Sequence, residues 1–361
     1  MKSSSFFLDS FTPPVIYAKL EAKFPNEPIL ALESAVVNEF GNFSYFCVGA
    51  KEELIYKNGE TTYKNEYGIS KKIDENIFDF CKSYYSKLDQ EYYINECKKL
   101  GLGFIDGFVG FLGFEIMSQI EPILQKTTAT LKDELNLPDL AMIRPKLIIA
   151  YAHKSGTVTL VAHTQDIENS LAEIKNILMA SFEHKPLTKA ILNGEPKYSL
   201  TEQEFCNVVD DFKEHIKAGD VFQILPSCRI SYPATVNPLD FYRILRTKNP
   251  SPYMYLLKMG DYTIAGSSPE LMTSVNQNSE VLIKPIAGTR KRGSTPQKDI
   301  AMQEEMLNDP KECAEHIMLV DLARNDIGRV CKAGSIKVTE LMKVEKYSHV
   351  MHMVSDVIGI L

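Results

Sequence analysis

Glu312 and Glu315 are the first residues of this chain whose type and spacing could do chemistry. Three positions apart on a helix, they share one face. The apolar residues 317–320 that follow predict a mostly buried helix. A buried carboxylate needs a counter-charge or a metal ion, and Mg2+ is usually held by one or two carboxylates together with water and substrate oxygens. Taken alone, the pair more commonly marks a solvated acidic helix face.

A glycine turn and a histidine lie nearby in the C-terminal part of the chain. Gly288 and Thr289 follow an apolar stretch at 281–287 that predicts a strand. Glycine lets backbone N–H groups approach a carboxylate, and threonine adds a hydroxyl donor. His352 is flanked by apolar residues, where a histidine is more often part of the core than a catalyst. Two interpretations therefore remain for each feature. The glycine turn is either an anion site or a plain turn, and His352 is either a proton carrier or a core residue.

Two domains are expected to position these residues. Residues 11–165 read mostly as strands and turns, including a hairpin at 147–161. Residues 184–200 are polar and broken by Pro and Gly, which predicts a linker. We therefore expect an N-terminal domain at 1–183 and a second domain at 201–361 that carries most of the candidate chemistry.

The second domain is expected to mix helices and strands. Residues 201–204 form a capping box, the helix behind them has one apolar face, and Gly219 is a natural stop. Residues 221–225 predict a buried strand, 299–326 one or two helices, and 335–340 a short strand.

Composition argues against several function classes. The 361 residues carry a formal net charge of −7 without a basic stripe, which argues against nucleic-acid binding. Seven cysteines without a C-x-x-C pair argue against structural zinc and a disulfide framework, and indicate a reducing cytosol. The N-terminus has too short an apolar run for a signal peptide, and the longest apolar runs have strand length. We expect a cytoplasmic protein with no membrane role.

Several segments together resemble the large subunit of anthranilate synthase (component I), among the chorismate-binding enzymes. The resemblance is carried jointly by residues 12–13, 32–34, 219–223, 249–255, 268–270, 285–290, 309–316, 320–326 and 347–352. It implies an α+β fold of mixed α/β character, with large antiparallel sheets and flanking helices. Family members continue past the point where this sequence stops. We therefore expect a C-terminally truncated chain whose catalytic domain is incomplete and whose activity in isolation is in doubt.

The resemblance implies roles for the residues around the expected helix and turn. Glu315 would ligate Mg2+, with Glu312 in support through water. Ala287, Gly288 and Thr289 would line the chorismate pocket. These three residues would thus hold the substrate, and the two glutamates its metal.

The resemblance also implies the reaction. Ammonia adds at C2 of chorismate with loss of the C4 hydroxyl, and pyruvate is then eliminated to give anthranilate. His352 would lie beside the ring and assist departure of the hydroxyl and proton movement. Glu270 would stand near that leaving group as an acid or an electrostatic partner. Mg2+ would grip the substrate carboxylate.

Two positions distinguish this chain from similar enzymes. Isochorismate and salicylate synthases carry a Lys in place of Gln223, and that Lys activates water. A neutral amide cannot act as the base, so Gln223 favours ammonia as the nucleophile. Aminodeoxychorismate synthase carries a Lys in place of Ala287, and that Lys can attack chorismate covalently.

A tryptophan site is implied by two segments that lie far apart in sequence. Glu33 and Ser34 belong to the first, and Pro252, Tyr253 and Met254 to the second. Together they could clamp an amino acid between the domains. Ordinary core and turn residues are the alternative, because Asn-Pro-Ser-Pro is itself a turn signal.

The expected function is that of a synthase subunit in the first committed step of tryptophan biosynthesis, feedback-inhibited by tryptophan. Its ammonia would come from a glutamine amidotransferase subunit (component II). Such an enzyme is a Mg2+-dependent lyase. Aminodeoxychorismate synthase and a non-catalytic tryptophan-binding fragment are the alternatives.

Overall fold

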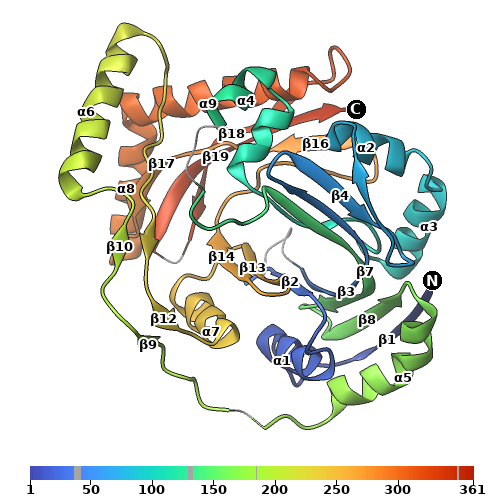
Figure 1. Cartoon of the computed structure of the whole chain (residues 1–361). Helices are drawn as coiled ribbons and strands as arrows, with labels where there is room; N and C mark the ends of the chain where they lie inside the picture. Colours follow the sequence, from blue (N-terminus) through green and yellow to red (C-terminus); the bar gives the residue numbers. More distant parts are fainter. Residues whose placement is uncertain (36–41, 129–132, 184, 348) are drawn as a thin grey trace. The chain divides into compact units, whose positions relative to one another are not determined.

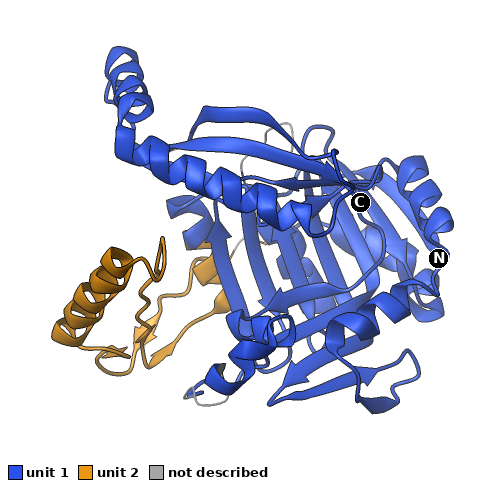
Figure 2. Ribbon diagram, turned by 90° about the horizontal axis from the view of Figure 1, so that it is seen from above, with its two compact units in different colours: residues 1–181, 245–361 blue, residues 182–244 orange. Residues whose placement is uncertain are grey.

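The computed structural model describes residues 1–361 except 36–41, 129–132, 184 and 348. It falls into two compact units. The first combines residues 1–181 with 245–361, and the second consists of 182–244 (Figure 2). In the part of the chain that the structure describes, no helix is long and apolar enough to cross a bilayer.

A ten-stranded antiparallel sheet forms much of the first unit (Figure 1). Its main path runs β1-β8-β7-β3-β2-β13-β14, while β4 and β6 pair with β3 and β7, and β5 pairs with β4. The strands are β1 (Lys2–Phe7), β2 (Ile29–Glu33), β3 (Phe43–Lys57), β4 (Glu60–Lys64), β5 (Ser70–Ile73), β6 (Val109–Leu112), β7 (Leu140–Ala152), β8 (Thr157–Ala162), β13 (Tyr253–Lys258) and β14 (Thr263–Ser268).

Helices cover both faces of this sheet. The helices are α1 (Pro13–Lys23), α2 (Ile77–Tyr85), α3 (Gln90–Leu100), the short α4 (Gln125–Thr128) and α5 (Gln165–Met179), with 3-10 turns at Phe114–Gln119 and Pro122–Leu124. α1 and α5 contact each other and the strands β2 and β8. On the opposite face, Leu30, Cys47 and Ile148 pack with Leu102 and Ile105, directly after α3. The sheet is therefore an apolar core layer rather than an exposed surface.

A five-stranded antiparallel sheet carries the C-terminal part of the first unit. Its strands are β15 (Ser274–Val275), β16 (Glu280–Ile283), β17 (Ile286–Lys291), β18 (Lys337–Lys346) and β19 (Val350–Ile360). The helices α8 (Pro296–Asn308) and α9 (Pro310–Gly328) pack on it. β19 is its organising strand, because β16, β17 and β18 all pair with it.

Alternation along β19 separates two sets of side chains. Met351 and Met353 pack with Met306 of α8, and Val357 packs with Val320 of α9. These odd-numbered residues face the helices. Since successive residues of a strand point to opposite faces, His352 and Asp356 face away from the helices.

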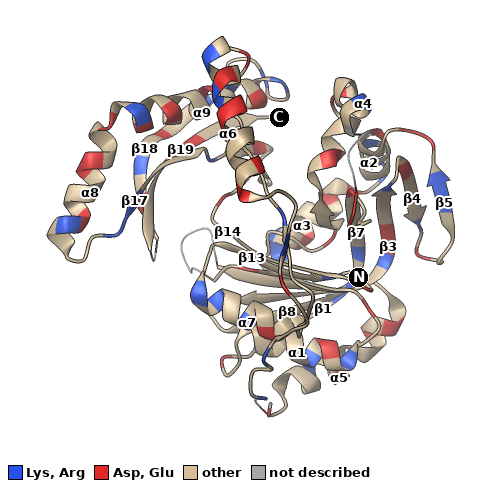
Figure 3. Ribbon diagram, turned by 60° about the vertical axis from the view of Figure 1, so that its left-hand side comes forward, with Lys and Arg blue, Asp and Glu red and all other residues tan. Residues whose placement is uncertain are grey.

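The second unit is small and open. Two short strand pairs, β9 (Ile191–Leu192) with β12 (Ala234–Thr235) and β10 (Lys197–Tyr198) with β11 (Ile230–Ser231), accompany α6 (Glu202–Ala218) and the start of α7 (Pro238–Lys248). Acidic and basic residues are interspersed along the ribbon of both units (Figure 3).

Several expectations are confirmed. Both large sheets are antiparallel with flanking helices, as expected for an α+β fold. The hairpin at 147–161 is the β7–β8 pair. The capping box is present, since Thr201 and Glu204 exchange backbone-to-side-chain hydrogen bonds, and Gly219 ends α6 with φ +82°. The helical stretch at 299–326 forms α8 and α9.

Other expectations are wrong. Residues 221–225 form no strand, and Phe222 and Leu225 are 88% and 90% exposed. An apolar run becomes a strand only where a neighbouring strand pairs with it, and among the described residues no strand pairs with this run. Residues 11–165 hold α1, α2, α3 and the short α4 besides the strands. The short strand at 335–340 is the longer β18.

The chain is also divided differently from the expected domains. A linker at 184–200 was expected to separate 1–183 from 201–361, but its first residue, His184, lies outside the described residues. In the structure the hairpin of β13 and β14 pairs with β2 and joins the N-terminal sheet. The first compact unit therefore ends at Ser181 and resumes at Leu245, and the second unit consists of the residues between them.

Candidate functional site

Gly288 forms a bulge in the edge strand β17. The register of β17 against β19 shifts between Ala287 and Thr289, and Gly288 has φ +70°. This left-handed conformation strains any residue with a side chain. A Cβ at Gly288 would also lie 2.8 Å from the terminal methyl carbon of Met353 and 3.4 Å from Oε2 of Glu312. The glycine therefore both bends the strand and leaves room for a carboxylate.

The bulge brings Thr289 opposite His352. Thr289 Oγ1 lies 3.0 Å from Nδ1 of His352, and the carbonyl oxygen of Gly288 lies 3.3 Å from the same nitrogen. A carbonyl can only accept a hydrogen bond. The contact with Gly288 therefore favours the tautomer with hydrogen on Nδ1, which leaves the lone pair on Nε2. A histidine in this state can take up a proton at Nε2.

Tyr347 and Glu345 lie on the other side of the histidine. The ring of Tyr347 meets that of His352 edge-on, with 5.5 Å between centroids. Glu345 of β18 is the cross-strand neighbour of His352, and its Oε2 accepts a hydrogen bond of 2.8 Å from the Tyr347 hydroxyl. Burial, followed by this hydrogen bond, raises the pKa of Tyr347. The tyrosine is thus held as a neutral donor to Glu345.

Glu312 is paired with an arginine on the helix side of the sheet. Its Oε1 accepts from Nη1 of Arg290 at 3.1 Å, and Asp309, the N-cap of α9, accepts from Nη2 of the same arginine at 2.8 Å. The hydrogen bond to Glu312 is the main reason that the pKa of Arg290 is raised. Glu312 is only half-buried, with 21% of its side chain exposed, and Arg290 supplies its counter-charge, so no metal ion is required to explain its burial.

Glu315 lies three residues after Glu312 on α9 and is half-buried. The buried residues His316 and Val320 lie on the stripe of α9 that packs on the sheet. Among the described residues, no group of three or more His, Cys, Asp or Glu side chains is arranged to hold a metal ion. Two carboxylates, with Glu312 Oε2 turned toward Gly288, still fit a Mg2+ site that water and substrate oxygens complete.

Gly288 is the point where the two halves of the candidate site approach each other. Thr289 and His352 lie on the face of the sheet away from the helices, whereas Arg290 and Glu312 lie on the helix side. The carbonyl of Gly288 contacts His352, and the missing side chain of Gly288 faces Glu312. A ligand at the β17 edge would meet both sets of groups there.

A buried histidine next to Glu315 was missed by the sequence argument. His316 Nε2 lies 2.6 Å from Oγ of Ser355, and that oxygen accepts from the backbone N–H of Met342 at 2.9 Å. Met342 has φ +54° within an irregular part of β18. Burial lowers the pKa of His316. The spacing 312, 316, 320, 323 and 327 of a buried helix stripe was the signal that could have found it.

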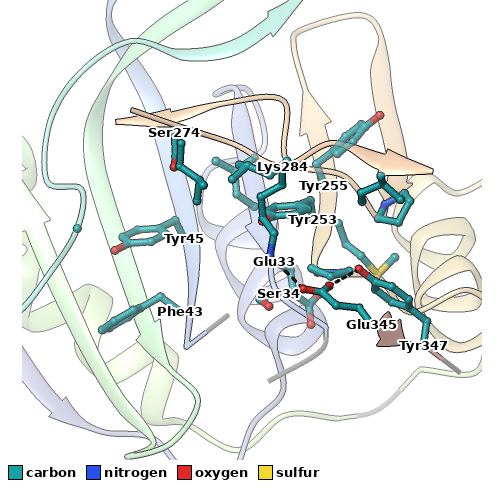
Figure 4. A pocket seen from close by; sticks show the side chains of 18 residues that line it. Glu33, Ser34, Phe43, Tyr45, Tyr253, Tyr255, Ser274, Lys284, Glu345 and Tyr347 are labelled. Carbon is teal, nitrogen blue, oxygen red and sulfur yellow. Dashed lines mark hydrogen bonds and ion pairs between the residues drawn. The ribbon is translucent and has the colours of Figure 1, made fainter. Parts of the chain in front are cut away.

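Both segments expected to bind tryptophan line one cavity of about 630 Å³ (Figure 4). The strands β2 and β13 are paired, with Met254 opposite Glu33. The walls are largely apolar and aromatic. They are formed by Leu32, Glu33, Ser34, Phe43, Tyr45, Gly103, Pro252, Tyr253, Met254, Tyr255, Pro269, Leu271, Ser274, Leu282, Lys284, Ile286, Glu345 and Tyr347. The volume lies in the range of small-molecule sites, about 300–1,000 Å³.

Charged groups enter this cavity from two sides. Glu33 Oε1 accepts from Nε of Arg246 at 2.6 Å, and the glutamate side chain is 1% exposed. Lys284 also lines the cavity, and its Nζ lies 3.0 Å from Glu345 and 3.5 Å from Asp356. Burial alone would lower the pKa of Lys284, but these two carboxylates outweigh it and raise the pKa.

Two of the expected catalytic residues are exposed. Glu270 is exposed after β14, and no hydrogen bond joins its side chain to His352 in the described parts of the chain. Gln223 belongs to the second compact unit, in an exposed irregular segment. Their roles stay predictions, as do those of the other residues assigned from the resemblance.

A model of the chorismate binding enzyme family matches residues 31–361. The chain belongs to the chorismate-binding enzymes. The anthranilate synthase component 1 of Neisseria gonorrhoeae is 36% identical over 372 residues, which covers 98% of this chain and 72% of the relative. That of Aquifex aeolicus is 33% identical, covering 99% of this chain and 72% of its own length.

Solved structures of chorismate-binding enzymes show the same fold. Anthranilate synthase component I of Streptococcus pneumoniae aligns with a TM-score of 0.73 at 32% identity, covering 90% of this chain and 70% of that one. The menaquinone-specific isochorismate synthase of Escherichia coli aligns with a TM-score of 0.62 at 11% identity, over 100% of this chain and 71% of that chain. The second match shows the fold alone.

Proposed function

We propose that this chorismate-binding enzyme is the anthranilate-forming subunit of an anthranilate synthase, a lyase of tryptophan biosynthesis. One observation carries the proposal. The chain that holds His352 against Thr289 and Gly288 is similar over 98% of its length to anthranilate synthase component 1. The reaction adds ammonia to chorismate, expels the C4 hydroxyl and eliminates pyruvate.

His352 is the proton carrier of this proposal. Its Nδ1 is held by Gly288 and Thr289, and its ring rests against Tyr347. Nε2 is then free of these contacts and can take a proton from the substrate or return one to the departing hydroxyl. Ala287, Gly288 and Thr289 bind the ring side of chorismate, and Glu270 assists at the leaving group.

Mg2+ is the proposed cofactor, held by Glu315 with Glu312 in support. When bound, the ion polarises a carboxylate of the substrate as a Lewis acid. Arg290 orients Glu312, because its guanidinium contacts Glu305, Asp309 and Glu312 together. The protein thus prepares the carboxylate side of the site.

The nucleophile is ammonia, delivered by a glutamine amidotransferase partner. Gln223 has no basic nitrogen, so it cannot remove a proton from water as a lysine could. Ala287 is 9% exposed at the start of the bulge, and it cannot attack chorismate. These two residues favour anthranilate over isochorismate and aminodeoxychorismate as the product.

Tryptophan is the proposed feedback inhibitor, bound in the cavity lined by Glu33, Ser34 and residues 252–254. Feedback requires that the cavity communicate with the chemistry. Tyr347 supports this link, since it lines the cavity and its ring contacts His352. An enzyme of this pathway works in the cytoplasm.

Purified protein supplied with chorismate, Mg2+ and ammonium tests the proposal. Anthranilate, detected by its fluorescence, is the expected product. Aminodeoxychorismate as the main product would favour the alternative synthase instead. Absence of any amine product, together with tryptophan binding, would favour a non-catalytic tryptophan-binding role. That outcome would overturn the catalytic proposal for this chain.

A further inference from the structure

Lys284 and Glu345 form an ion pair on the wall of the tryptophan cavity that the five-stranded sheet contributes. The two side chains are 12% and 31% exposed, and both line the cavity. In Figure 4, Lys284 reaches toward Glu345, and Tyr347 meets the same carboxylate. A complete ion pair beside apolar and aromatic walls is an unusual lining for a site that takes only an indole ring.

We propose that Lys284 and Glu345 recognise the zwitterionic end of the bound amino acid, Lys284 taking its α-carboxylate and Glu345 its α-ammonium group. The inference rests on the tryptophan site of the proposed function and adds to it the residues that read the charges. It predicts a ligand of defined class, a free α-amino acid with a large apolar side chain.

Charge conservation is the physical argument. Removing one partner of a partly buried ion pair leaves an uncompensated charge in a poorly hydrated place and is unfavourable. A zwitterion brings one charge of each sign, so the pair can exchange partners without leaving either group unpaired. Asp356, 3.5 Å from Lys284 Nζ, keeps the ammonium anchored during that exchange. An indole without these charges has nothing to offer the pair.

Glu33 is the other carboxylate in the cavity, and its surroundings differ. Its charge is already met by Arg246, which is not among the residues that line the cavity. Glu345 is instead paired with a lysine that itself lines the cavity. Glu345 can therefore turn to a ligand while its former partner turns to the same ligand. Glu33 is therefore part of the cavity wall, and Arg246 holds its carboxylate.

The absence of tryptophan from the chain gives a direct binding assay, since the sequence holds no Trp. Fluorescence anisotropy of an indole ligand, excited where tyrosine absorbs little, reports the ligand alone. Three ligands separate the charges: tryptophan, tryptamine without the carboxylate, and indole-3-propionate without the ammonium group. The unaltered protein is expected to bind tryptophan at least about tenfold more tightly than either analogue, the effect of one lost charge-assisted contact.

Two single variants assign the charges. Lys284→Met should erase the preference for tryptophan over tryptamine and keep the preference over indole-3-propionate. Glu345→Gln should do the reverse. The double variant Lys284→Met/Glu345→Gln removes both charges of the pair, with Asp356 losing its lysine, and should bind all three ligands alike. It keeps the test valid where a single variant folds poorly.

A matched control is available on the same strand. Lys343 and Glu340 of β18 form an exposed ion pair at 3.0 Å outside the cavity. The variant Lys343→Met/Glu340→Gln should leave all three affinities unchanged. If the Lys284 and Glu345 variants still prefer tryptophan over both analogues, this inference is wrong, although the cavity would remain the tryptophan site. Failure of the unaltered protein to bind tryptophan would overturn both.

Discussion

Ser355 Oγ lies 2.6 Å from Nε2 of His316, and both side chains are fully buried between α9 and β19. The serine oxygen also accepts a hydrogen bond from the backbone N–H of Met342, whose backbone is in the left-handed conformation. One hydroxyl therefore fixes a helix, a strand and a strained turn.

Replacing that hydroxyl should destabilise the fold. Ser355→Ala leaves a buried N–H and a buried imidazole without their partner, at a cost of about 1–3 kcal/mol. Urea unfolding at neutral pH measures the loss. Ser10→Ala, at an exposed serine, is the control and should change nothing. Equal midpoints for the two variants would show that the hydrogen bond does not stabilise the fold.

Because His316 is buried, the protein should become less stable at mildly acidic pH. Burial lowers its pKa, so the unfolded chain takes up a proton more readily than the native protein. Its contribution is intact above the unfolded pKa, about 6.5, and is lost as pH falls below that value. Urea midpoints between pH 8 and about pH 5 should fall less in His316→Gln than in the unaltered protein. Parallel curves would contradict the prediction.

The buried pair of Asp106 and Arg144 should govern stability at lower pH. Oδ2 of Asp106 contacts Nη2 of Arg144, and Oε1 of Glu52 lies 2.9 Å from Nη1 of the same arginine. Burial alone would raise the pKa of Asp106, but Arg144 and neighbouring donors lower it. A lowered carboxyl pKa stabilises the native state above the unfolded pKa, about 3.9, and this contribution is lost as pH falls below it.

Asp106→Asn should therefore cost about 3 kcal/mol at pH 7, the lower end for breaking a buried pair, because Glu52 still faces Arg144. Chemical unfolding at pH 7 and below pH 4 tests this. The variant should lose less stability between the two pH values than the unaltered protein does. Glu60→Gln, which removes the exposed pair with Lys72, serves as control and should leave the midpoint unchanged.

Glu315 should be required for Mg2+-dependent turnover. In an active form of the enzyme, Glu315→Gln should abolish turnover while thermal unfolding stays near that of the unaltered protein. Glu304→Gln, at an exposed position of α8, should keep full activity. Retained activity at saturating Mg2+ would remove Glu315 from the metal site.

Ser34 should control inhibition rather than turnover. It is 7% exposed on the cavity wall, so the larger side chain of Ser34→Leu would occupy the space of the ligand. The tryptophan concentration for half inhibition should rise at least about tenfold, equivalent to a loss of about 1.4 kcal/mol of binding. Uninhibited turnover should change little. An unaltered inhibition curve would return Ser34 to the role of a core residue.

Gln223 should set the nucleophile. Gln223→Lys supplies a base for water, and a positioned base contributes about 10²–10⁴-fold. Product analysis should show isochorismate rising at the expense of anthranilate. If the unaltered enzyme already makes isochorismate efficiently from chorismate and water, the assignment of ammonia is wrong.

Local signals predicted the elements that local physics determines. The capping box of α6 and the β7–β8 hairpin depend on residues close in sequence. Pro13 in the first turn of α1 is a further local signal, because proline favours the start of a helix. The antiparallel pairing of β13 with β2 joins residues that are far apart in the chain. No periodicity within either strand encodes such a pairing.

The candidate site was predictable in part for the same reason. Type and spacing pointed to Glu312, Gly288 and His352, but not to the face of the sheet on which each lies. That division follows from the bulge at Gly288. Lys284 and Glu345 were not singled out from the sequence, because an ion pair across strands has no local pattern.

β19 carries His352 on one face and Met353 and Ser355 on the other. A slip of the strand by one residue would exchange these faces. Packing beneath α9 and α8 therefore sets the register in which the histidine is presented. A screen for stabilising substitutions under those helices should also recover variants with altered activity, since repacking the methionine layer moves the strand that carries His352, the proposed proton carrier.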